Sequence, residues 1–124
     1  MRTAATPDYV TPGIDAFGDG GFRVAGQRHE GSILIAGASI LVWPVTDPKA
    51  VTPEAFAAFL QAEEKPDLVI FGAGARLVLP PAPVRDAFLK ANIGIETMDT
   101  PTACRSYNLL AGEARRAWAA LIAV

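Results

Sequence analysis

In the middle of the chain, the four apolar residues Leu68-Val69-Ile70-Phe71 form an unbroken run that ends at Gly72-Ala73-Gly74. Consecutive apolar residues without alternation are typical of a strand that is covered on both faces, as in the centre of a parallel sheet. The glycines stop the run and allow the chain to turn sharply. The sequence therefore predicts a central strand at 68–71 in a layered α/β fold.

Helix signals surround this run. Thr52-Pro53 and Thr100-Pro101 each combine a capping residue with proline at the first helical position, and Pro83 opens another helix. Apolar side chains then recur at helical spacing. Helices are expected at 53–64, 83–91 and 100–111, with a further strand at 93–97. Alternation of strands and helices favours right-handed parallel crossovers in this half of the chain.

The amino-terminal half has a different character. Short runs rich in β-branched and aromatic residues are separated by glycines, and Gly18-Asp19-Gly20-Gly21 supplies the positive φ angles of a tight hairpin. Strands are expected at 14–17, 22–25, 32–35 and 40–43, forming an antiparallel meander. Residues 1–13 show no periodicity and are expected to form a flexible arm, which leaves 14–124 as a single domain.

The last segment is ambiguous from its local pattern. Ala114, Ala117, Trp118, Leu121 and Ile122 fit helical spacing, and the alanines favour a helix. Gly112 would interrupt the preceding helix, however, and a terminal strand could use the same apolar run. The local pattern favours the helix and leaves the strand open.

Composition excludes several classes of function. Hydrophobic residues make up 51% of the 124, charged residues 19%, and the formal net charge is -2, which is typical of a globular protein. Without a basic cluster, nucleic acid is not an expected partner. No stretch is apolar enough for a signal peptide or a spanning helix, so the cytoplasm is the expected compartment. Because Cys104 and His29 are the only residues of their kinds, neither a disulfide within the chain, nor a structural zinc site, nor another cofactor is expected.

Ligands of open α/β sheets bind at the carboxyl ends of the parallel strands. That rule places the Trp43-Pro44 pair, the loop at 72–76 and the Met98-Asp99-Thr100 segment on one rim. The candidate binding rim consists of Trp43, Gly72, Gly74, Arg76, Glu96, Asp99 and Thr100.

The rim residues allow chemical and structural interpretations. Gly72-x-Gly74 after a buried strand suggests an anion cradle, but neither a third glycine nor a Gly-Lys-Ser/Thr motif follows, and a simple turn is favoured. Glu96 lies inside a predicted strand, where a buried carboxylate needs a partner, and an ion pair with Arg76 or Arg105 is expected. Asp99 is placed favourably at the start of a helix.

Side chains that serve as nucleophiles elsewhere lack the usual neighbours here. Ser106 has no Gly-x-Ser-x-Gly context and no histidine nearby, so no catalytic residue is assigned. Cys104 is expected to be buried, although a reactive thiol stays open as an alternative. His29 lies in a polar segment that we interpret as a solvated turn. Asparagine is unfavourable in the middle of a helix, so Asn108 is expected there only if a tertiary contact uses its side chain.

Three segments together resemble a known family. They are Phe71-Gly-Ala-Gly, Gly94-Ile-Glu-Thr-Met-Asp-Thr-Pro-Thr-Ala-Cys-Arg-Ser-Tyr-Asn-Leu-Leu and Glu113-Ala-Arg-Arg. The chain resembles a family of uncharacterised domains that includes the mitochondrial respiratory complex I assembly factor and the adipogenesis-associated Mth-domain protein. The likeness covers nearly the whole chain, with mild departures at Ala73, Ser106 and Ala114.

The resemblance implies a three-layer α/β fold, in which a mixed central sheet with flanking helices carries an added antiparallel β layer from the amino-terminal half. It also implies that the final segment is a strand antiparallel to the others, and we adopt this strand because tertiary context overrides weak helix propensity.

For function, the resemblance implies a non-enzymatic binding or assembly factor for a membrane-associated, respiratory-type complex, with a subunit of that complex as protein partner. The alternative is an enzyme or a small-molecule or anion-binding protein that uses the Gly72-Gly74/Glu96-Thr100 rim. A homo-oligomer that associates through Trp118 or Phe22 is a third hypothesis.

Overall fold

The computed structural model describes residues 12–111 and 116–124. Two sheets and the helices between their strands make up this part of the chain. In chain order the elements are β1 (Ile14–Gly18), β2 (Gly21–Val24), β3 (Gln27–Glu30), β4 (Ile33–Ala36), β5 (Ser39–Val42), the 3-10 helices η1 (Pro48–Ala50) and η2 (Pro53–Phe56), α1 (Ala57–Leu60), β6 (Leu68–Gly72), α2 (Ala82–Lys90), β7 (Gly94–Met98), α3 (Thr100–Ala111) and β8 (Ala117–Leu121).

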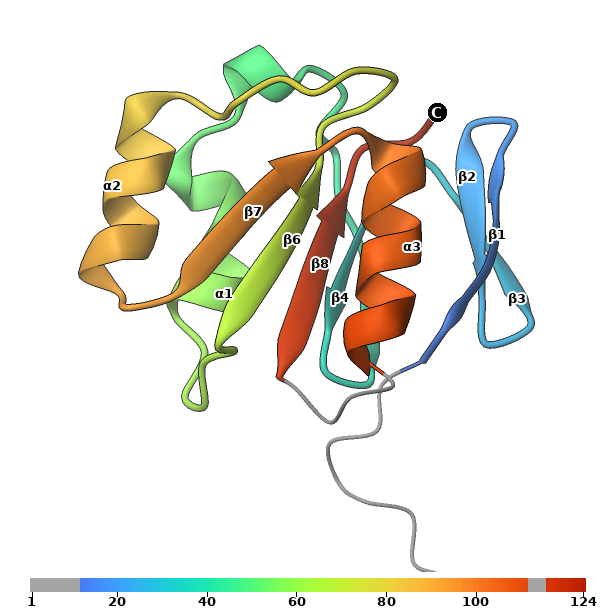
Figure 1. The fold of residues 1–124 in the computed structure, drawn as a ribbon, viewed down its shortest axis with the longest axis horizontal. Helices are drawn as coiled ribbons and strands as arrows, with labels where there is room; N and C mark the ends of the chain where they lie inside the picture. The colour runs from blue at the N-terminus through green and yellow to red at the C-terminus, as the bar shows by residue number, and fades with distance from the viewer. Residues whose placement is uncertain (1–11, 112–115) are drawn as a thin grey trace, which may run out of the picture.

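The central sheet has the strand order β5-β4-β8-β6-β7. Strand β6 is parallel to both β7 and β8, whereas β4 is antiparallel to both β5 and β8. The final segment is thus a strand, as the resemblance implied, and the helix favoured by the local pattern is wrong. Its expected antiparallel direction is also wrong with respect to β6, because α3 returns the chain from the end of β7 to the edge of the sheet where β6 begins (Figure 1).

The three-layer prediction is confirmed. On β6 the side chains of Val69 and Phe71 pack toward η2, α1 and α2, while those of Leu68 and Ile70 pack toward α3 and the amino-terminal strands. In Figure 1 α1 and α2 lie on one side of the sheet, and α3 lies on the other side beside β1, β2 and β3. All five residues of β6 are buried, which explains why its sequence does not alternate.

The amino-terminal strands divide between the two sheets. Strands β1, β2 and β3 form a separate antiparallel sheet, whereas β4 and β5 join the central one, so the predicted single meander is split. Strand β3 was not expected, because its sequence Gln-Arg-His-Glu is polar and mostly exposed. His29 accordingly lies on this strand opposite Phe22 rather than in a turn.

Helix α3 holds the small sheet through its side chains. The Asn108 amide group accepts a hydrogen bond from the Ile14 nitrogen and donates one to the Ile14 carbonyl, both at 2.8 Å. This contact accounts for an asparagine in the middle of a helix. The Tyr107 hydroxyl donates to the Pro12 carbonyl, and the Gly13 carbonyl accepts from Ala25. Residues 12 and 13 therefore belong to the fold rather than to the expected arm, whose other residues lie outside the described ranges.

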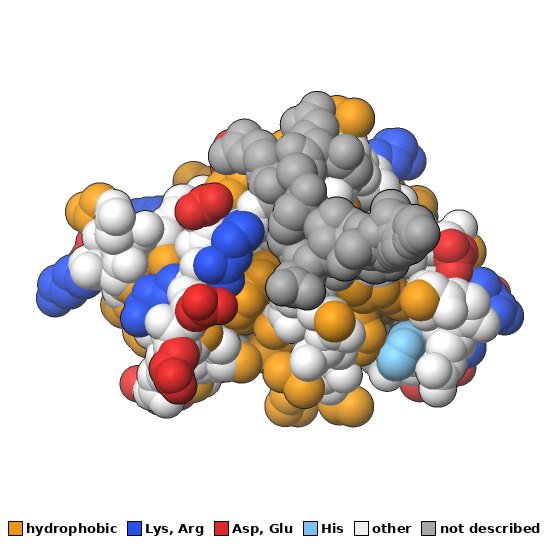
Figure 2. Space-filling model, turned by 90° about the horizontal axis from the view of Figure 1, so that it is seen from below, with side chains coloured by type: hydrophobic (Ala, Val, Ile, Leu, Met, Phe, Trp, Pro, Cys, Tyr) orange, Lys and Arg blue, Asp and Glu red, His pale blue; other side chains and the backbone are white. Residues whose placement is uncertain are grey.

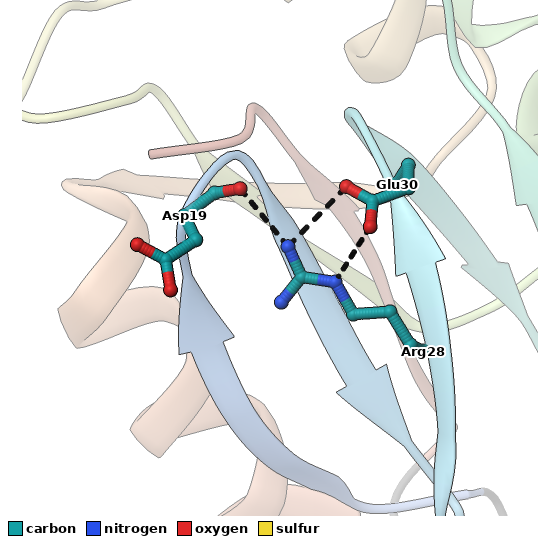
Figure 3. A network of polar contacts seen from close by, with 3 residues as sticks. All are labelled: Asp19, Arg28 and Glu30. Atoms are coloured by element: carbon teal, nitrogen blue, oxygen red, sulfur yellow. Dashed lines mark hydrogen bonds and ion pairs between the residues drawn. The ribbon is translucent and has the colours of Figure 1, made fainter.

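Two sets of contacts hold the hairpin between β1 and β2. In the first, the Arg28 guanidinium donates to the Asp19 carbonyl at 2.9 Å and to the Glu30 carboxylate at 3.0 Å (Figure 3). The pKa of Glu30 is lowered by that hydrogen bond and by the nearby positive charge. The Gly20 nitrogen donates to the Val124 carbonyl at 2.8 Å, which ties the end of the chain to the hairpin.

The predicted helix at 53–64 is much shorter than expected. It begins as the 3-10 helix η2 and continues only to Leu60 in α1. The Thr52 side chain makes no capping hydrogen bond. Beyond Leu60, residues 61–65 are polar apart from Ala62, so continuing the helix along the core would bury little apolar surface.

Candidate functional site

One end of the central sheet collects the carboxyl ends of four strands, β5, β6, β7 and β8. The backbone of the predicted rim is therefore assembled as the sequence suggested. The rim residues nevertheless differ in what their side chains do. Thr100, Gly72 and Gly74 form a buried junction, Asp99 caps α3, and Trp43 is part of the core. Arg76 and Glu96 are exposed.

Thr100 holds the junction between the two parallel crossovers. Its hydroxyl accepts a hydrogen bond from the Gly74 nitrogen at 2.9 Å and donates one to the Ile122 carbonyl at 2.7 Å. Its own nitrogen donates to the Gly74 carbonyl at 2.8 Å. Because the Thr100 side chain is fully buried, these bonds connect the segments after β6 and β8 to the start of α3 without competition from water.

Both glycines have structural reasons to be glycine. A Cβ atom at Gly72 would lie 3.0 Å from the Leu121 side chain and from the Thr100 hydroxyl, so a larger residue would push α3 away from β6. Gly74 adopts a φ angle of 104°. Since its amide already donates to Thr100, it is not available to an anion, and the turn interpretation fits these two glycines better than the anion cradle does.

Asp99 is the capping residue of α3. Its two carboxylate oxygens accept from the Thr102 nitrogen at 2.8 Å and from the Thr102 hydroxyl at 3.0 Å. These hydrogen bonds, the backbone one first, lower the pKa of Asp99 below its usual range. Thr100, which the sequence suggested as the cap, is instead the first residue of the helix. The contribution of Asp99 to stability is therefore present above its unfolded-state pKa and is lost as the pH falls through the lower folded-state pKa.

Trp43 follows β5 at the rim, but its ring points into the core and is 3% exposed. The indole nitrogen donates to the Ala55 carbonyl at 2.8 Å, and the ring lies 5.3 Å from that of Phe56 and 6.1 Å from that of Phe71. A buried tryptophan with a satisfied N–H stabilises the layer between the sheet and η2. Its side chain presents no surface to a ligand in this structure.

The ion pair expected at Glu96 does not form. Strand β7 is an edge strand, so Glu96 reaches solvent and needs no buried partner. Within residues 12–111 and 116–124, the ion pair that the structure contains joins Arg28 to Glu30. Arg76 and Arg105 are likewise exposed. Arg76 therefore remains accessible at the rim.

The loop that carries Arg76 also carries two exposed leucines that the sequence did not single out. Leu77 and Leu79 are 60% and 63% exposed, and they follow Arg76 in the segment between β6 and α2. Neither helical nor strand periodicity marks them, and the available signal was a run of apolar residues outside any predicted element. We call Arg76, Leu77 and Leu79 the rim loop.

Cys104 lies on α3 and packs into the core between the sheet and that helix. Burial raises the pKa of its thiol to about 12. At pH 8 the group is therefore a neutral, inaccessible thiol, and we expect iodoacetamide to leave it unmodified in the folded protein and to alkylate it in denaturant. Mass spectrometry of both samples measures this, and rapid alkylation of the folded protein would instead reveal a reactive thiol.

Other candidate features of the described residues are few. The described part contains no cluster of three or more histidine, cysteine, aspartate or glutamate side chains that could hold a metal ion. None of its helices is long and apolar enough to cross a membrane. A shallow hollow of about 310 Å³ lies at the opposite end of the sheet, where β6 and β7 begin. It is lined by Asp67, Leu89, Asn92, Ile93 and Gly94. It includes none of the predicted rim residues.

Comparison with known proteins identifies the family. The model of a family described as "Protein of unknown function (DUF498/DUF598)" matches residues 14–122. The chain belongs to the DUF498/DUF598 family. Among the curated relatives is human NADH dehydrogenase [ubiquinone] 1 alpha subcomplex assembly factor 3, which is 32% identical over 122 residues. The match covers 98% of this chain and 64% of the human protein, so the chain spans under two thirds of that relative's length.

Solved structures of similar proteins share the fold. A protein of Bartonella henselae, described as an outer membrane protein, superposes with a TM-score of 0.87 at 32% identity, covering 95% of this chain and 99% of that one. A Bordetella pertussis protein described as a Mth938-like domain gives a TM-score of 0.74 at 28% identity, covering 98% of this chain and 92% of that one. The family and the three-layer fold predicted by the resemblance are thereby confirmed.

Proposed function

We propose that this chain is a non-enzymatic assembly factor that binds a subunit of a membrane-associated, respiratory-type complex from the cytoplasmic side. The observation that carries the proposal is the similarity, along 98% of the chain, to a human protein named as an assembly factor of NADH dehydrogenase. Shared fold alone does not transfer a function. The proposal therefore needs a surface on this chain that suits a protein partner.

The rim loop suits a protein partner better than a small ligand. Its two leucines expose apolar side chains beside the exposed guanidinium of Arg76, and arginine is enriched at protein interfaces because it offers several donors and an apolar stem. Both ends of the loop are anchored, at Gly74 by Thr100 and at the Pro80 carbonyl by the Arg85 side chain. A loop held at both ends loses less conformational entropy when it binds.

Affinity capture tests the proposal in the cells that make the protein. The tagged chain is crosslinked briefly and purified under native conditions, and the captured proteins are identified by mass spectrometry. We expect the wild type to recover a defined subunit of a membrane-bound respiratory complex. We expect the double substitution Leu77→Asp, Leu79→Asp to lose it, because charged side chains at an apolar contact are costly to desolvate. We expect Arg76→Ala to weaken it, because the substitution removes the guanidinium donors and the apolar stem.

Leu109→Asp is the matched control, because Leu109 is a similarly exposed leucine on α3. It should leave capture unchanged. If the wild type recovers no such subunit above an untagged sample, the assembly function is wrong. If the rim-loop variant recovers the subunit as well as the wild type does, the function stands and the contact lies on another surface.

A further inference from the structure

Strand β5 leaves one edge of the central sheet open. Its inner side pairs with β4, where Leu41 lies opposite Leu34 and the Trp43 nitrogen donates to the Ser32 carbonyl at 3.0 Å. Hydrogen-bonded pairs alternate along an antiparallel ladder. The N–H and C=O groups of Ile40 and Val42 therefore point away from β4, toward the open edge. Such a row of backbone donors and acceptors is a template for another strand.

Apart from Ser39, the side chains of β5 are apolar, and none of them carries a charge. Val42 is 82% exposed and Leu41 is 40% exposed. Residues 31–46, which contain β4, β5 and both flanking segments, include no charged residue. Exposed edges of natural sheets are usually blocked by charged side chains or proline within the strand. The opposite edge of this sheet follows that rule, because Glu96 is exposed on β7.

The end of the sheet that carries the turn between β4 and β5 exposes hydrophobic side chains. The turn between β4 and β5 lies on the side of the sheet where β6, β7 and β8 begin, because β4 runs antiparallel to β8. Figure 2 views the molecule from that side and shows charged side chains toward the two ends of the face, with hydrophobic side chains gathered between them.

We infer that β5 pairs antiparallel with β5 of a second copy of this chain, joining the two central sheets into one. A twofold axis at Leu41 would place Ile40 of each copy opposite Val42 of the other. The outward N–H and C=O groups of Ile40 and Val42 then form the new hydrogen bonds, because these backbone groups do not bond to β4. Self-pairing places Leu41 of the two copies together at the axis, and an uncharged edge meets its copy without the repulsion that like charges cause across strands.

The size of the edge sets the strength of this contact. Strand β5 has four residues, whereas a stable interface buries roughly 800 Å² on each partner. We therefore expect a weak dimer whose population depends on concentration. The inference is independent of the proposed assembly function, since it concerns a different surface and a different partner.

Sedimentation equilibrium of the full chain tests the inference between about 10 μM and about 1 mM, a range that covers weak self-association. We expect a monomer–dimer equilibrium for the wild type, and for Val42→Lys a dissociation constant raised at least about tenfold because two lysines enter the ladder. Leu89→Lys is the matched control, since Leu89 is 79% exposed on α2, and it should dimerise as the wild type does.

Amide hydrogen exchange is a second test, and it uses the wild type alone, so its result does not depend on how a substitution affects folding. We expect the amides of Ile40 and Val42 to become protected as the concentration rises, while the amide of Glu96 on the other edge keeps its rate. A chain that stays monomeric throughout, or a dimer that Val42→Lys leaves intact, would overturn the inference. So would concentration-independent exchange at Ile40 and Val42, including the case in which these amides are protected only after a different protein is added.

Discussion

Replacing Trp43 by alanine is expected to lower the free energy of unfolding by about 3–5 kcal/mol. The ring fills a space between β5, η2 and β6, in edge or tilted contact with Phe56 and Phe71. Its removal leaves a cavity that close-packed neighbours refill only in part. It also leaves the Ala55 carbonyl without the donor that it has in the native structure.

Chemical denaturation followed by circular dichroism measures this loss. Leu77→Ala is the matched control, because it removes a large apolar side chain from the exposed rim loop and should change the free energy of unfolding by no more than about 0.5 kcal/mol. If Trp43→Ala were as stable as Leu77→Ala, the tryptophan would have to be a surface residue, and its place in the candidate binding rim would regain support.

The part of the fold that could be predicted depends on local burial. The run 68–71 is apolar on both faces, so its place at the centre of the sheet follows from its sequence alone. The segment 117–121 is also buried apart from the half-buried Trp118, yet its alanines satisfy helical and strand patterns equally. Pairing with β4 and β6 decides between them, and the paired residues lie 84–88 positions away on β4 and 49 positions away on β6. Only the family resemblance supplied that information.

In the candidate site too, one feature could be predicted from the sequence and another could not. The topology rule placed the backbone of the rim, because it depends only on strand order and direction. It could not say which side chains face solvent. Trp43 turns inward because η2 packs over it, and Glu96 reaches water because β7 has no neighbour on one side. Both facts depend on distant segments, whereas the capping role of Asp99 depends on the next three residues and was partly foreseen.

Replacing Thr100 by valine is expected to lower the free energy of unfolding by about 2–4 kcal/mol, because each buried group left without a partner costs about 1–3 kcal/mol. Valine matches threonine in shape but leaves the Gly74 nitrogen and the Ile122 carbonyl unpaired. The damage should be local as well. We expect the Gly74 amide to exchange with solvent much faster, since its acceptor is the missing hydroxyl.

The substitution Thr100→Ser distinguishes the contribution of the hydroxyl to stability from that of the methyl group. Serine keeps both hydrogen bonds and loses one buried methyl group, which costs about 1 kcal/mol. Denaturation and exchange of the two variants should therefore differ in both stability and Gly74 protection. If Thr100→Val were no less stable than Thr100→Ser, the hydroxyl would not be what fixes the junction. The Gly74 amide, which is committed to Thr100 in this structure, would then be free to bind an anion, and the cradle interpretation of the rim would regain support.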